Sequence, residues 1–136
     1  MTRRTALIAV VVGVALLSAG SVARAHHAFA AEFDVNKPIK FSGTIKKVDW
    51  ANPHIYTHVE TKEGGKTVVY KVEGGPPNSL YRQGWRKDTL KVGETVSVKG
   101  IRAEREDSHN VGQATITMAD GRRIFSGTGQ AAAQQQ

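Results

Sequence analysis

The chain has 136 residues, with 19 Lys and Arg against 12 Asp and Glu, and a formal net charge of +7. It has no cysteine, which excludes disulfide bonds, thiolate metal sites and a cysteine nucleophile. A chain of this length forms one domain with a modest core.

The first 25 residues are typical of a cleaved secretory signal peptide. A positive start, Met1 to Arg4, precedes an apolar run from Ala6 to Leu17, and Ala23-Arg24-Ala25 supplies a small-residue cleavage site. The alternative is an uncleaved membrane anchor, but a spanning helix needs about 20 apolar residues. The sequence therefore predicts a periplasmic or secreted protein, exported by the general secretory or the twin-arginine route.

Cleavage after Ala25 would make His26 the first residue, with His27 behind it. The remaining domain would run over residues 26–126, with a disordered tail at 127–136 that is small, polar and without apolar periodicity. Because three arginines leave with the signal peptide, the net charge falls from +7 to +4. Such a weak positive charge favours acidic ligands only slightly.

Alternating apolar residues predict strands through most of the domain. Residues 26–37 form a lead-in, and the first strand is expected at 39–50, where the apolar phase slips by one residue after Ile45. A phase slip close to a glycine, here Gly43, is typical of a β-bulge. A turn at 51–53 then leads into the second strand.

The second and third strands are expected at 54–60 and 67–73, joined by a hairpin turn at 63–66. One face of the second strand carries Ile55, Thr57 and Val59. The opposite face carries His54, Tyr56, His58 and Glu60.

A short helix follows, expected from Leu80 to Trp85, capped by Asn78 or Ser79 and with Leu80 and Tyr81 pointing inward. Further strands are expected at 95–101, 113–119 and 122–125, with a polar loop at 102–110. Three strands, a helix and two strands predict a small all-β antiparallel barrel of five to six strands like the OB-fold. Another small barrel or sandwich is the alternative.

Several motifs together resemble a family of small exported bacterial proteins of unknown function. They are His26-His27-x-Phe29, Ala31-Glu32-Phe33-Asp34, Gly43-Thr44-Ile45, Trp50-x-Asn52-Pro53-His54, Leu80-x-x-x-Gly84-Trp85, Leu90-x-x-Gly93 and Asp120-Gly121-Arg122. The resemblance covers nearly the whole mature chain. It implies export and one compact β domain, and it implies no activity or catalytic residue.

Histidines are the candidate metal ligands. If His26 is the first residue, its α-amine and ring can chelate one cation, and a further imidazole completes a copper or zinc site. We expect His26, His27 and His54 to form this cluster, and His58 to take less part, since four strand steps separate it from His54 by roughly 13 Å. The alternative is that His26 and His27 are merely solvated and that His54 closes a turn.

Aromatic residues near basic ones suggest a second kind of binding surface. Trp50, Tyr56 and Trp85 are the candidates for a ligand face, although core or rim packing is the favoured explanation of the two tryptophans. OB-folds bind single-stranded nucleic acid on such faces, but the export signal and the weak charge argue against it. Membrane contact is expected only through an uncleaved signal peptide.

No catalytic constellation stands out. The serines lie in no nucleophile motif, a GxGxxG phosphate loop is absent, and scattered acids do not make an acid–base pair. The sequence therefore predicts a non-enzymatic binding domain for a small ligand, a metal ion or an envelope protein. The alternatives are a copper-binding or copper-trafficking protein that uses His26, and a structural or protein-interaction module of the cell envelope.

Overall fold

The computed structural model describes residues 31–125, and the fold below is that of the unit that begins at Phe33. Six strands and one short helix build it. They are β1 (Phe33–Asp49), β2 (Tyr56–Glu63), β3 (Lys66–Glu73), α2 (Pro77–Arg82), β4 (Thr95–Ala103), β5 (Asn110–Met118) and β6 (Arg123–Phe125). His26, His27 and the predicted signal peptide and tail lie outside the described residues.

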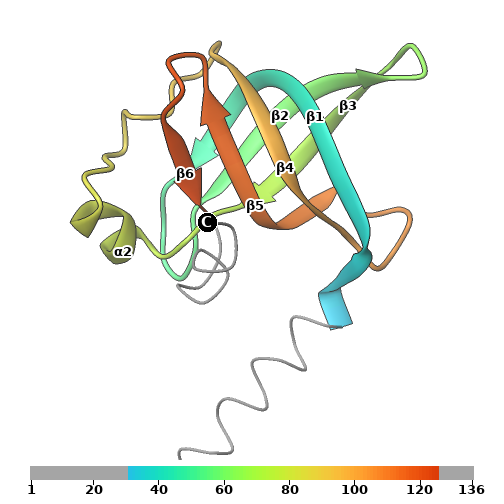
Figure 1. Cartoon of the computed structure of the whole chain (residues 1–136), viewed down its shortest axis with the longest axis horizontal. Helices are drawn as coiled ribbons and strands as arrows, with labels where there is room; N and C mark the ends of the chain where they lie inside the picture. Colours follow the sequence, from blue (N-terminus) through green and yellow to red (C-terminus); the bar gives the residue numbers. More distant parts are fainter. Residues whose placement is uncertain (1–30, 126–136) are drawn as a thin grey trace, which may run out of the picture. The chain divides into compact units, whose positions relative to one another are not determined.

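The strands close into a ring. β1 pairs antiparallel with both β2 and β4, β2 pairs with β3, and β4 pairs with β5. A short parallel pairing of β3 with β5, at Lys71–Asn110 and Val72–Val111, completes the circle through five strands. β6 adds to β5, and α2 lies at one end, between β3 and β4 in the chain (Figure 1). The predicted OB-fold-like barrel is confirmed.

The first strand starts earlier than predicted. It spans 17 residues and begins at Phe33, whereas the apolar alternation indicated a start at Ile39. Phe33 pairs with Ala103 on β4, and its ring is 3% exposed. A Cβ on Gly112 would lie 2.9 Å from that ring, so the glycine makes room for it. This tertiary contact, and not local periodicity, extends the strand.

The predicted bulge is confirmed. The pairing of β1 with β2 shifts register between Ile45 and Lys47, so Lys46 is the extra residue. Three residues before Lys46, β1 and β2 approach so closely that a Cβ on Gly43 would lie 2.3 Å from the carbonyl oxygen of Glu60. Glycine is required there because its neighbour is backbone and cannot move aside cheaply.

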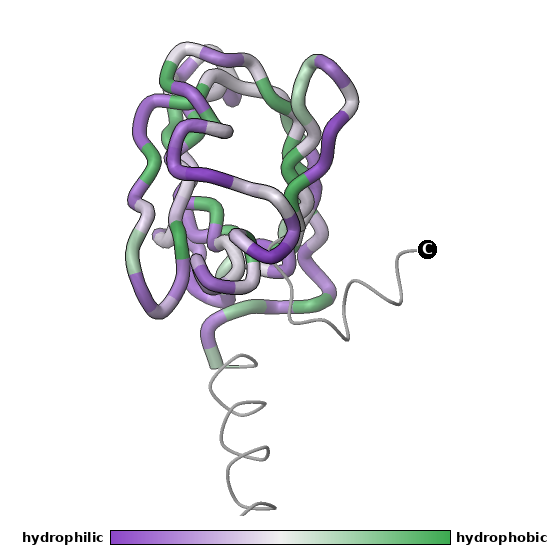
Figure 2. Tube along the Cα trace, turned by 90° about the vertical axis from the view of Figure 1, so that its left-hand side faces the viewer, coloured by the Kyte–Doolittle hydropathy of each residue, from purple (hydrophilic) through white to green (hydrophobic). Residues whose placement is uncertain are grey.

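The core fills the barrel. Apolar and polar residues alternate along the strands (Figure 2), and the residues on the inward side are almost fully enclosed. Ile45, Val59, Val72, Val98 and Val111 each have no exposed surface. Burial of this kind stabilises by roughly 25 cal/mol for each Å² of apolar surface removed from water.

The helix differs from the prediction. It begins at Pro77, with Pro76 as the N-cap residue and no capping side chain, so the predicted caps at Asn78 or Ser79 are wrong. Proline suits the first helical position, which Pro77 occupies, because its missing N–H would have no helical partner there. Leu80 is buried as predicted, whereas Tyr81 is 39% exposed and does not point inward.

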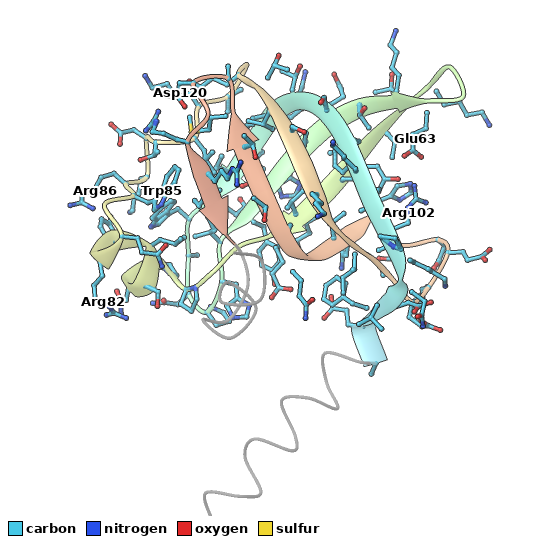
Figure 3. The ribbon with its side chains drawn as sticks, in the orientation of Figure 1. Glu63, Arg82, Trp85, Arg86, Arg102 and Asp120 are labelled. Carbon is cyan, nitrogen blue, oxygen red and sulfur yellow. The ribbon has the colours of Figure 1, made fainter. Side chains whose placement is uncertain are left out.

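Near the turn of the β2–β3 hairpin, Tyr70, Glu63 and Arg102 form a polar cluster. The Tyr70 hydroxyl donates to Glu63 Oε1 at 2.7 Å and accepts from Arg102 Nη2 at 2.8 Å. Figure 3 shows Glu63 and Arg102 at the end of the barrel opposite α2. Burial, and secondly the hydrogen bond to Glu63, raise the pKa of Tyr70 to about 12.

Among residues 31–125, no helix has both the length and the apolar character that crossing a bilayer would require.

Candidate functional site

The outward side of β1, β2 and β3 carries a group of polar side chains that we call the outer face. It consists of Lys47, Asp49, His54, Tyr56, His58, Lys71 and Glu73. These residues face outward because their neighbours Val48, Thr57 and Val72 face the core. The predicted split of the second strand into two faces is thus confirmed, although the strand itself begins at Tyr56 and not at His54.

His54 lies just before β2 and is held against the end of β3. The backbone of Ile55 donates to Gly75 O at 3.2 Å and accepts from Gly74 N at 2.8 Å, which ties the two segments together. This brings His54 Nδ1 against Glu73 Oε1. Since an ionised carboxylate only accepts hydrogen bonds, Nδ1 carries the proton and Nε2 is the nitrogen left for another partner.

His58 has a carboxylate partner of its own. Its Nε2 lies 2.9 Å from Asp49 Oδ2, and Lys47 Nζ lies 2.7 Å from the other oxygen of the same carboxylate. The hydrogen bond from Lys47, and secondly that from His58, hold the pKa of Asp49 below its usual range, so this carboxyl stays ionised at neutral pH.

Tyr56 and Lys71 occupy the middle of the outer face. Tyr56 follows His54 by two residues on the same strand face, and it is the cross-strand partner of Glu73. The ammonium of Lys71 lies 4.0 Å from the centre of the Tyr56 ring, a cation–π contact. The outer face therefore presents two histidine–carboxylate pairs on either side of a cation stacked on a phenol ring.

The two histidines engage separate carboxylates: His54 contacts Glu73, and His58 contacts Asp49. Within residues 31–125, no group of three or more His, Asp or Glu side chains is arranged to hold a metal. The predicted cluster of His26, His27 and His54 stays a prediction, because His26 and His27 lie outside the described residues.

The three aromatic candidates occupy different surroundings. Only Tyr56 belongs to the outer face. Trp85 is 8% exposed and packs in the core. Trp50 is partly buried against the core and meets Tyr81 edge-on, with ring centres 5.7 Å apart. Among the described residues, its indole Nε1 has no hydrogen-bond partner.

Sequence reasoning missed Glu73 and Lys71, although the signal was present. The hairpin turn at 63–66 sets the register in which Tyr56 faces Glu73 and His58 faces Lys71. The inward face of β3 at Val68, Tyr70 and Val72 leaves the odd-numbered residues outward. Continuing the hairpin register from its turn to its open end identifies both residues. His109 is exposed, with its ring 5.6 Å from that of Tyr70.

A model described as a family of unknown function (DUF6152) matches residues 13–113. Searches of the curated proteins and of the solved structures found no match.

Proposed function

Because this chain belongs to the family of unknown function DUF6152, we propose its function from its own geometry: it is an exported, non-enzymatic binding domain that takes its ligand on the outer face. The observation that carries the proposal is the contact of His54 with Glu73, which holds one imidazole in a set orientation. Strands 2 and 3 and the loop after strand 1 form the customary binding surface of OB-folds. His54 lies at the junction of these elements.

We infer that the ligand is a divalent metal ion such as copper or zinc. Histidines that bind metals usually donate their second ring N–H to a carboxylate, which orients the ring and raises its basicity. His54 has this partner in Glu73, and its Nε2 is the donor atom. His26, through its α-amine and its ring, and His27 supply the further nitrogens.

Binding, not catalysis, fits the open position of the outer face. Acid–base catalysis needs an acid and a base converging on one substrate. The two histidine–carboxylate pairs, His54 with Glu73 and His58 with Asp49, are instead separate, and the Tyr56–Lys71 contact lies on the same outer face.

The test starts with the exported protein. N-terminal sequencing should give His26 as the first residue, and calorimetric titration with Cu²⁺ should show one site. His54→Ala should weaken binding at least tenfold, whereas His109→Ala, at an exposed histidine outside the outer face, should not. A version with one extra residue before His26 should also bind more weakly, because its amine is displaced.

Equal copper affinity in the His54→Ala and His109→Ala variants would refute the metal site. If the processed protein begins at another residue, the amine ligand is lost and the outer face alone remains as the binding surface. The protein would then be a metal-independent interaction module of the cell envelope.

A further inference from the structure

The charge of the described domain is concentrated at one end. Residues 31–125 carry 16 Lys and Arg against 12 Asp and Glu, a net charge of +4. Two segments, 77–94 and 119–125, hold six of these cations and three of the acids, and so account for +3. We call these two segments the basic end. Figure 3 shows Arg82, Arg86, Trp85 and Asp120 together at the α2 side of the molecule, away from Glu63 and Arg102.

The basic end contains a hollow. Its volume is about 300 Å³, and its lining combines an indole wall with two guanidinium groups, two polar side chains and a glycine, namely Trp85, Arg122, Arg123, Gln83, Thr89 and Gly84. This size is at the lower limit of sites for small organic ligands. The hollow lies where the chain after α2 meets the turn between β5 and β6, so tertiary structure alone creates it.

Two arginines at this end, Arg122 and Arg86, are held in place before any ligand arrives. The Arg122 guanidinium lies 5.9 Å from the centre of the Trp85 ring, and its Nε donates to Asp120 Oδ2 at 2.7 Å. Arg86 donates from Nη1 to the carbonyl oxygens of Trp85 and Tyr81 at 2.7 and 3.1 Å. Ordered guanidinium groups lose less entropy on binding an oxyanion than free ones would.

We propose that this hollow binds a small ligand with at least two carboxylate or phosphate groups. Guanidinium groups recognise such oxyanions through paired hydrogen bonds. A single charge on the ligand is insufficient, because Asp120 already neutralises part of Arg122. A nucleic acid strand fits less well, since it needs exposed aromatic rings for base stacking and Trp85 is 8% exposed. This site is separate from the outer face, and neither proposal depends on the other.

The experiment titrates the full chain, in a non-ionic detergent, with citrate and with pyrophosphate by isothermal calorimetry. The double variant Arg122→Gln/Arg123→Gln should weaken binding by at least about tenfold, the value of one lost charge-assisted hydrogen bond. The matched control is Lys40→Gln/Lys99→Gln, which removes the same charge from an exposed cross-strand pair on β1 and β4. It should keep the wild-type affinity.

A second variant guards against misfolding. Gln83→Glu places a carboxylate in the lining of the hollow, at an exposed position after α2. It should weaken the binding of both anions without changing the melting temperature of the protein. If the lysine control loses as much anion affinity as the arginine variant, the loss reflects net charge alone and the proposed site is wrong. Absence of citrate and pyrophosphate binding at millimolar concentration would also overturn it. A parallel assay without detergent offers phosphatidylglycerol vesicles. If only these bind, in a manner that requires Arg122 and Arg123, the partner is a lipid surface and the small-ligand proposal is wrong.

Discussion

The side chains of His54 and Glu73 meet at the open end of the β2–β3 hairpin, with the Nδ1 of one against the Oε1 of the other. His54 precedes β2, and Glu73 is the last residue of β3. The contact fixes the orientation of the His54 ring, and the proposed metal site depends on this orientation.

Removing the carboxylate should weaken metal binding while leaving His54 in place. Glu73→Gln keeps the size of the side chain but loses the charge that orients the imidazole, so we expect a 10- to 100-fold weaker affinity for Zn²⁺ or Cu²⁺. Calorimetric titration measures it. The control is Glu60→Gln on β2, which removes an acid that pairs with Lys46 of β1. If both variants bind metal like the wild type, Glu73 has no positioning role.

The Asp49 carboxyl should titrate below its ordinary pKa of 3.8. Because the pKa is lowered in the folded protein, the ionised form favours folding above pH 3.8, and this contribution is lost as the pH falls through the folded pKa. Lys47→Met should raise the pKa of Asp49, since Lys47 is the main cause of the shift. Carbon-detected NMR titration of the carboxyl group measures it, with Lys46→Met as the control. A pKa unchanged by Lys47→Met would contradict the assignment.

Stability should fall in strongly alkaline solution because of Tyr70. Its pKa is raised to about 12, so the folded protein holds the phenol proton more tightly than the unfolded chain does. This contribution is complete below pH about 10 and is lost as the pH rises through about 12. Urea denaturation across this range should show the loss in the wild type and in Tyr81→Phe, at an exposed tyrosine. It should be much smaller in Tyr70→Phe, and an equal loss there would assign the effect elsewhere.

β1 and β2 lie too close together at Gly43 to leave room for a side chain there. An alanine Cβ would lie 2.3 Å from the Glu60 carbonyl oxygen, so the strands must shift apart. We expect Gly43→Ala to destabilise the fold by about 1–3 kcal/mol. Ser42→Ala, at the exposed neighbouring position, should change the free energy of unfolding by less than about 0.5 kcal/mol. Chemical denaturation compares the two variants, and similar values would show that β1 relaxes freely.

The buried hydroxyl of Thr57 should be dispensable. Thr57 is 1% exposed, and its Oγ1 has no hydrogen-bond partner among the described residues. Thr57→Val replaces an unsatisfied polar group with a methyl group of similar shape, so stability should rise by about 1 kcal/mol.

The matched control for that substitution is Thr61→Val on the same strand. Thr61 Oγ1 donates to the Ser42 carbonyl oxygen at 2.8 Å. Its replacement should therefore cost about 0.5–1.5 kcal/mol, the usual net value of a hydrogen bond. Loss of stability in both variants, measured by urea denaturation, would show that the Thr57 hydroxyl has a partner.

Local pattern was sufficient for the strands and their faces. Alternation of apolar and polar residues predicted that Ile55 and Val59 point inward and Tyr56 and His58 outward, because side chains of a strand alternate whatever lies beside it. The phase slip after Ile45 likewise predicted the bulge. Both are properties of neighbouring residues in the chain.

Local pattern failed where a distant contact decides. β1 begins at Phe33 because its ring fits beside Gly112, and the helix starts at Pro77 without a side-chain cap. Trp85 offered no local sign of whether it packs or faces a ligand. It lies in the core because α2 and the loop after it fold back on the barrel.

Composition and periodicity were enough to identify a cysteine-free β domain with a bent first strand and histidines on one face. Tertiary structure is needed to bring His54 to Glu73, His58 to Asp49, and Arg122 and Arg123 to the hollow beside Trp85. The physical reason is that periodicity reports the side on which a residue lies, whereas its partner depends on hairpin register, the bulge and closure of the ring between β3 and β5.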